Sequence, residues 1–81
     1  MLTEYIQAAM KQATFEMLED DEDKFWGEIP GLQGVWATGK TLDACKEELR
    51  EVLEGWLLVS FSHNLPVPEI EGINLDVKRA V

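Results

Sequence analysis

The stretch that decides the fold joins a turn, a short strand and the start of a helix. It reads Pro30-Gly31-Leu32-Gln33-Gly34-Val35-Trp36-Ala37-Thr38-Gly39-Lys40-Thr41. Its proline and two early glycines are typical of a turn, because glycine adopts backbone angles closed to other residues. Gly39 lets the chain swing out of the strand at 35–38, and Thr41 suits the N-cap of a helix. The stretch therefore predicts that two strands meet at the turn and that a long helix begins at Thr41.

Two further strands are predicted on the N-terminal side of this turn. Residues 13–19 and 24–29 are the strand candidates, and the acids at 20–23 fit a solvated hairpin turn better than a cation site, because the ligand spacing of a calcium loop is missing. With 35–38 they form a three-stranded antiparallel meander. The face expected to meet the long helix carries these residues: Phe15, Met17, Phe25 and Ile29.

The opposite face of the sheet is expected to carry two tryptophans. The turn at 30–34 places Glu28 opposite Trp36, and Trp26 opposite Thr38, so Trp26 and Trp36 share a face. Large exposed aromatic residues are enriched in binding hot spots, so Trp26, Glu28 and Trp36 are candidates for a partner surface. The alternative is that the N-terminal helix covers both tryptophans through Ile6, Ala9 and Met10.

One helix is predicted before the meander and one after it. Residues 3–12 predict a short helix, and the long helix is expected from Thr41 to about His63. Its buried stripe comprises Leu42, Cys45, Leu49, Val52, Leu53 and Trp56. Asn64 can take a left-handed conformation and end this helix. A final strand at 73–78 is expected beside the first, which gives the sheet order 3-2-1-4 and an α+β fold for a single domain over 1–81.

The last turns of the long helix are apolar on every side. Leu57, Leu58, Val59 and Phe61 follow one another too closely to share one face. A helix that is apolar all round is buried all round. We therefore expect this segment to contact a second copy in a dimer or tetramer, and the alternative is burial under the chain's own C-terminal tail.

Composition narrows the classes of partner. The net charge of the 81-residue chain is −9, with only 7 lysines and arginines, which argues against direct nucleic-acid binding and favours a basic protein partner. The lone Cys45 is interpreted as a core residue. No apolar run is long enough to span a membrane, and residues 1–5 lack the start of a signal peptide. A cytoplasmic location is expected.

No residue pattern indicates catalysis. Glu16, Glu19 and Glu28 match the converging carboxylates of a two-metal site only weakly. His63 has no histidine or cysteine partner at metal-ligand spacing, and its charged form suits a helix C-terminus. We therefore expect no enzyme activity, no bound metal and no cofactor.

The stretch at 30–41 resembles the signature of HicB-like antitoxin domains. The segments around it fit the same family: the aromatic strand Phe25-Trp26-Gly27-Glu28-Ile29 before it, and the helix from Glu48 to Trp56 and the exit Pro66-Val67-Pro68 after it. The resemblance covers roughly residues 14–78. It implies a truncated ribonuclease H-like fold. It also implies a role in neutralising a HicA-type toxin, a small basic RNA-cleaving protein, by covering its RNA surface or its catalytic histidine. The alternative function is an orphan oligomeric domain with a structural or regulatory role and no toxin partner.

Overall fold

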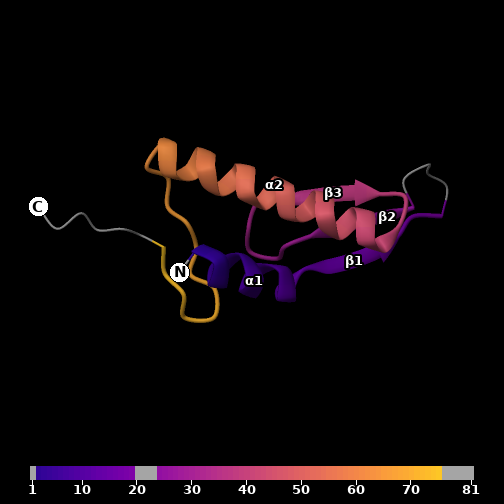
Figure 1. Cartoon of the computed structure of the whole chain (residues 1–81), viewed down its shortest axis with the longest axis horizontal. Coiled ribbons are helices and arrows are strands. Elements are labelled where there is room, and N and C mark those ends of the chain that lie inside the picture. Colours follow the sequence, from indigo (N-terminus) through magenta and orange to yellow (C-terminus); the bar gives the residue numbers. More distant parts are fainter. Residues whose placement is uncertain (1, 20–23, 76–81) are drawn as a thin grey trace, which may run out of the picture.

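The described part of the chain folds into two helices and three strands. The structure, a computed structural model, describes residues 2–19 and 24–75. In chain order the elements are α1 (Leu2–Gln12), β1 (Thr14–Met17), β2 (Phe25–Glu28), β3 (Trp36–Gly39) and α2 (Leu42–Ser62), as Figure 1 shows. The predicted α+β fold is confirmed, with a short N-terminal helix, a meander and a long helix. The acidic turn at 20–23 lies outside the described residues.

The sheet has the predicted order and register over its three described strands. β2 pairs antiparallel with both β1 and β3. Glu28 lies opposite Trp36, and Trp26 lies opposite Thr38. The turn between β2 and β3 holds this register because both of its glycines adopt left-handed backbone angles, with φ 88° at Gly31 and 86° at Gly34.

Both ends of α2 are capped by the residues expected to cap them. The Thr41 hydroxyl accepts a hydrogen bond of 3.0 Å from the Ala44 amide. At the other end, Asn64 adopts φ 52°. The Leu65 amide then donates to the Ser60 carbonyl at 2.8 Å, which is the six-to-one bond of a Schellman motif. Capping contacts made by neighbouring residues therefore mark both ends of this helix.

α2 packs against both the sheet and α1. Its N-terminal half lies across β3 and β2, and its C-terminal half packs against α1, which lies beyond the end of the sheet (Figure 1). Contact with β3 is close: a Cβ atom on Gly39 would lie 2.5 Å from the Cys45 backbone nitrogen. One core connects the elements, and it comprises Tyr5, Ile6, Ala8, Ala9, Ile29, Leu32, Val35, Ala37, Leu49, Leu53, Leu57, Val67, Ile70 and Leu75.

The segment after α2 folds back against α1. Tyr5 is fully buried, and its hydroxyl donates a hydrogen bond of 2.6 Å to the Pro68 carbonyl. Val67 and Ile70 are buried in the same core. α1, which would be a marginal helix alone, is therefore held between α2 and this segment.

Two expectations about burial are wrong. Met17 is 69% exposed, although it was expected to meet the long helix. The reason is that α2 packs mainly against β3 and β2, which leaves Met17, at the C-terminal end of the edge strand β1, uncovered. Leu42, expected at the start of the buried stripe, is 38% exposed because it stands in the first turn of α2.

The expected final strand is described only in part. Ile73 makes an isolated antiparallel bridge with Ile70, and residues 73–75 form no strand of the sheet. Residues 76–78 lie outside the described part, so a fourth strand beside β1 stays a prediction. Over the described ranges, 2–19 and 24–75, neither helix has the length and apolar character needed to cross a membrane.

Candidate functional site

The sheet has one face turned away from α2, which we call the tryptophan face. Its residues alternate along the three strands with those that meet the helix, and they are Thr14, Glu16, Trp26, Glu28, Trp36 and Thr38. Pairing places each tryptophan directly opposite a glutamate on the neighbouring strand, Trp26 with Glu16 and Trp36 with Glu28. The face therefore combines two indole rings with two carboxyl groups.

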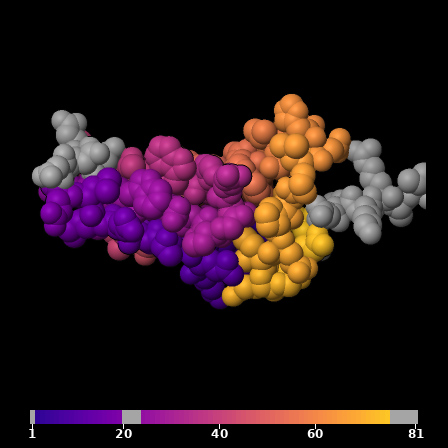
Figure 2. All heavy atoms as spheres, turned by 180° about the vertical axis from the view of Figure 1, so that it is seen from behind, coloured from indigo at the N-terminus to yellow at the C-terminus, as the bar shows by residue number. Residues whose placement is uncertain are grey.

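The tryptophan face is open. Trp36 is 53% exposed, and Trp26 and Glu28 are half-buried. The alternative in which the N-terminal helix covers the tryptophans is wrong, because α1 packs against α2 beyond the sheet. Figure 2, seen from behind, shows strand residues in purple and magenta at the surface with no helix across them.

A hollow borders this face. It has a volume of about 470 Å³ and lies beside the turn between β2 and β3. Its lining is one continuous stretch of chain that begins at Glu28, runs through the turn residues 29–35 and ends at Trp36. The hollow is large enough to receive a long side chain from a partner that docks on the tryptophan face.

A second exposed surface lies at the far end of α2, and we call it the apolar end. Leu58 is 68%, Val59 54% and Phe61 42% exposed. Leu2 and Leu65 extend the surface, at 47% and 51% exposure. A groove of about 230 Å³ runs between Leu2 and Phe61. Residues 65–75 leave these three helix residues exposed, and residues 76–81, on which the alternative of burial under the C-terminal tail also depends, lie outside the described residues.

Leu57 is not an exposed residue of the apolar end, although it lines the groove there. It is only 2% exposed and lies in the core. Its spacing explains this placement, because Cys45, Leu49, Leu53 and Leu57 follow at intervals of four and continue one buried stripe. Leu57 is therefore corrected from a candidate interface residue to a core residue.

Neither Cys45 nor His63 lies on the tryptophan face. The Cys45 thiol is fully buried, lies 3.6 Å from the Ala37 carbonyl as a hydrogen-bond donor, and has its pKa raised by burial. The interpretation of Cys45 as a core residue is confirmed. His63 is exposed at the end of α2. Within the part of the chain that the structure describes, no three His, Cys, Asp or Glu side chains gather as a metal site.

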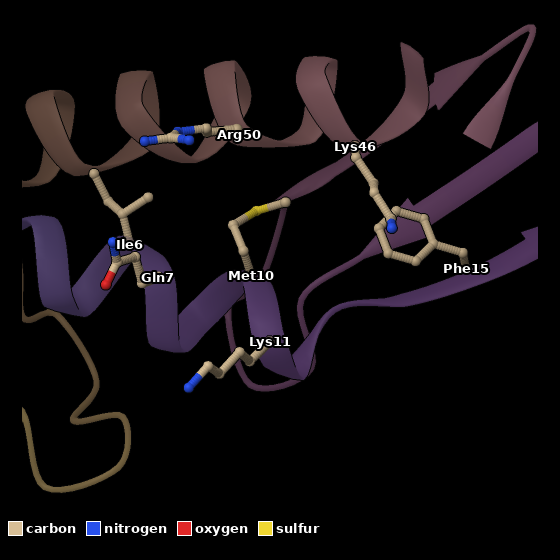
Figure 3. A pocket seen from close by; sticks show the side chains of 7 residues that line it. All are labelled: Ile6, Gln7, Met10, Lys11, Phe15, Lys46 and Arg50. Carbon is tan, nitrogen blue, oxygen red and sulfur yellow. The ribbon is translucent and has the colours of Figure 1, made fainter. Parts of the chain in front are cut away.

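One groove was missed by the sequence reasoning. It lies between α1 and α2 and is lined by Ile6, Gln7, Met10, Lys11, Phe15, Lys46 and Arg50 (Figure 3). Two spacings in the sequence bear on this groove, from Ile6 to Met10 and from Lys46 to Arg50. Each is four residues long and so places two side chains on one side of a helix. Nothing in the sequence indicated that these two helix sides would face each other.

Comparison with known proteins assigns the family. The sequence model of the UPF0150-like family matches residues 4–68, which include α1 from Glu4 onward, the whole sheet and α2. The chain belongs to the UPF0150-like family. Both surfaces described above therefore lie largely within the matched region.

Named relatives share this assignment. UPF0150 protein ssl0259 of Synechocystis sp. (strain ATCC 27184 / PCC 6803 / Kazusa) is 42% identical over 50 residues, which are 62% of this chain and 68% of that protein. UPF0150 protein ssr1258 of the same strain is 38% identical over 45 residues, which are 54% of this chain and 65% of that protein. These names state a family and no activity.

A solved structure has the same fold. The crystal structure of TTHA0281 from Thermus thermophilus matches with a TM-score of 0.89 and 41% sequence identity. The match covers 94% of this chain and 93% of that one. The arrangement of helices and strands in this UPF0150-like chain is therefore also found in a crystal.

Proposed function

We propose that this chain is a non-catalytic protein-binding domain that neutralises a small basic RNA-cleaving toxin of the HicA type. It acts by occlusion, covering the toxin's RNA surface or its catalytic histidine. The proposal builds on the resemblance of residues 30–41 and their flanks to HicB-like antitoxin domains. It places the chain in the cytoplasm with its toxin, and it requires neither a cofactor nor direct contact between this chain and nucleic acid.

The observation that carries the proposal is the tryptophan face. An arginine or lysine of a basic partner is attracted to the face of an indole ring, most strongly once the pair is desolvated. Glu16 and Glu28 stand opposite Trp26 and Trp36 and would balance the partner's charge. The net charge of −9 would steer a basic partner towards the chain and repel acidic ones.

Co-expression tests the proposal. The chain is produced together with the HicA-type toxin that the proposal assigns to it, and growth and co-purification are measured. We expect the wild-type chain to restore growth and to co-purify with that protein. Trp36→Ala should weaken the complex by about 30-fold or more, as expected for a hot-spot residue.

Met17→Ala is the matched control, because Met17 is also a large exposed side chain on the sheet but lies outside the tryptophan face. It should leave rescue and affinity unchanged. A chain that restores no growth and forms no complex would contradict the proposed function. A Trp36→Ala variant that binds as tightly as the wild type would contradict the assignment of the surface.

The apolar end favours a second candidate function, an oligomeric structural or regulatory domain without a toxin partner. Leu58, Val59 and Phe61 present exposed apolar side chains within one turn of α2, and such exposed apolar clusters are a common mark of a protein interface. Under this candidate, light scattering gives the mass of a dimer or tetramer, and the double variant Leu58→Asp/Phe61→Asp becomes monomeric. A monomeric wild-type chain would contradict it, and Met17→Asp is the control.

A further inference from the structure

The groove between α1 and α2 shares no lining residue with the tryptophan face and only Ile6 with the groove of the apolar end, and it has the size of a small-molecule site. Its volume is about 400 Å³, within the range of roughly 300–1,000 Å³ that ligand pockets occupy. α1 forms one wall, α2 forms the other, and Phe15 of β1 lies at one end (Figure 3).

The floor of the groove is apolar. Ile6 is 8% exposed, and Met10 and Phe15 are half-buried against the core. Ile6 and Met10 are four residues apart on α1, so they lie one turn apart on the same side of the helix. Figure 3 shows Met10 between the two helices. An apolar chain laid along this floor would cover surface that is now partly exposed to water.

The rim of the groove is cationic in a strongly acidic chain. The protein has 7 lysines and arginines against 16 acids, yet Lys11, Lys46 and Arg50 all line this one groove. In the described ranges, no aspartate or glutamate is among its lining residues. Lys46 and Arg50 stand one turn apart on α2, and Figure 3 shows their head groups pointing apart, Lys46 towards Phe15 and Arg50 towards the opposite end of the groove.

The two cations on α2 differ in how they are held. The Lys46 ammonium lies 5.8 Å from the centroid of the Phe15 ring, which keeps it over the apolar floor. The Arg50 Nε atom lies 3.4 Å from a Glu54 carboxylate oxygen, and both side chains are more than half exposed. Exposed ion pairs of this kind contribute little to the free energy of folding. An anion in the groove can therefore replace Glu54 as the partner of Arg50.

We propose that this groove binds a small amphiphilic anion. Its hydrocarbon chain lies on Ile6, Met10 and Phe15, and its carboxylate contacts Lys46 and Arg50 once their head groups, which point apart in Figure 3, turn towards it. Inorganic phosphate would leave the apolar floor uncovered, and a neutral hydrocarbon would leave the cations unused. The site is independent of the tryptophan face and of the proposed toxin binding.

Titration with octanoate, followed by amide resonances of the isotope-labelled chain, tests the site, and 1-octanol provides the same apolar chain without the charge. We expect saturable shifts at Met10, Phe15 and Lys46, and tighter binding of octanoate than of 1-octanol. The double variant Lys46→Gln/Arg50→Gln should weaken octanoate binding by about fivefold or more, because two exposed charge contacts are lost. Its affinity for 1-octanol should be unchanged. Lys40→Gln removes an exposed cation outside the groove and is the control.

Several results would overturn the inference. One is the absence of saturable shifts, and another is a set of shifts confined to the apolar end near Leu58 and Phe61. Equal affinity for octanoate and 1-octanol would remove the role of the cations, as would a double variant that binds octanoate like the wild type. Binding of an acidic peptide in the groove without any binding of octanoate would assign the site to a different class of ligand.

Discussion

The Tyr5 hydroxyl ties the first helix to the segment after the last one, and its removal should destabilise the fold measurably. Tyr5 is fully buried, and its hydroxyl donates to the Pro68 carbonyl at 2.6 Å across 63 residues of sequence. Tyr5→Phe keeps the ring and deletes only this donor. A hydrogen bond of this kind contributes about 0.5–1.5 kcal/mol to the free energy of unfolding.

This loss converts into a shift of the melting temperature. In a domain of about 60–100 residues, 1 kcal/mol corresponds to roughly 4–8 °C. Thermal unfolding followed by circular dichroism should therefore place Tyr5→Phe several degrees below the wild type. Gln12→Ala, an exposed change on the same helix, is the control and should stay within about 0.5 kcal/mol.

The same residue gives the stability a pH dependence. Burial raises the pKa of Tyr5 above its ordinary value of 10.0. The folded state therefore holds the phenol proton more tightly than the unfolded state does, and this contribution is complete below pH 10 and is lost as the pH rises through the folded-state pKa. The gap between wild type and Tyr5→Phe should thus be steady from about pH 7 to 9 and narrow above 10.

An ultraviolet titration reads this ionisation directly, because the chain contains one tyrosine. The absorbance change of phenolate should appear above pH 10 in the folded chain. Equal melting temperatures for wild type and Tyr5→Phe, or a gap that widens above pH 10, would refute the reasoning about this contact.

Other substitutions test the packing around α2 by chemical denaturation. Gly39→Ala should cost about 2 kcal/mol or more, because its Cβ would lie 2.5 Å from a backbone atom, whereas Gly55→Ala has open space and should stabilise the helix by about 0.5–1 kcal/mol. Thr41→Ala removes the N-cap acceptor and should cost about 1 kcal/mol, with Thr41→Ser restoring most of it. Leu57→Ala should cost about 2–5 kcal/mol, whereas Leu58→Ala should stay within about 0.5 kcal/mol, because the two leucines are 2% and 68% exposed.

Each pair has an outcome that contradicts its premise. Equal effects of the two glycine substitutions would mean that β3 and α2 are not in close contact. A neutral Thr41→Ala would mean that α2 does not depend on its cap. Similar costs for Leu57→Ala and Leu58→Ala would mean that the helix is rotated relative to the placement described here.

Features set by neighbouring residues could be predicted from the sequence. The turn at 30–34 fixes the register of Trp26 and Trp36, because its glycines take the left-handed angles that a tight connection requires. The two ends of α2 follow from a capping hydroxyl at Thr41 and a left-handed Asn64. Each of these depends on at most a few adjacent residues, which the sequence shows directly.

Features set by the docking of one element on another could not be predicted. Met17 and Phe15 share a face of β1, but only the position of α2 over β2 and β3 decides how much of each is covered. The burial of Tyr5 depends on Pro68, far away in the sequence. The cationic groove likewise exists only because α1 lies alongside α2, which no local pattern indicates.

Inhibition of RNA cleavage tests the proposed function most directly. The HicA-type toxin assigned by the proposal is purified, its cleavage of RNA is measured, and this chain is titrated into the reaction. We expect cleavage to stop when the chain equals the basic protein in amount, and we expect Trp36→Ala to require a large excess. Undiminished cleavage in the presence of a large excess of the folded wild-type chain would contradict the proposal that it works by covering a toxin.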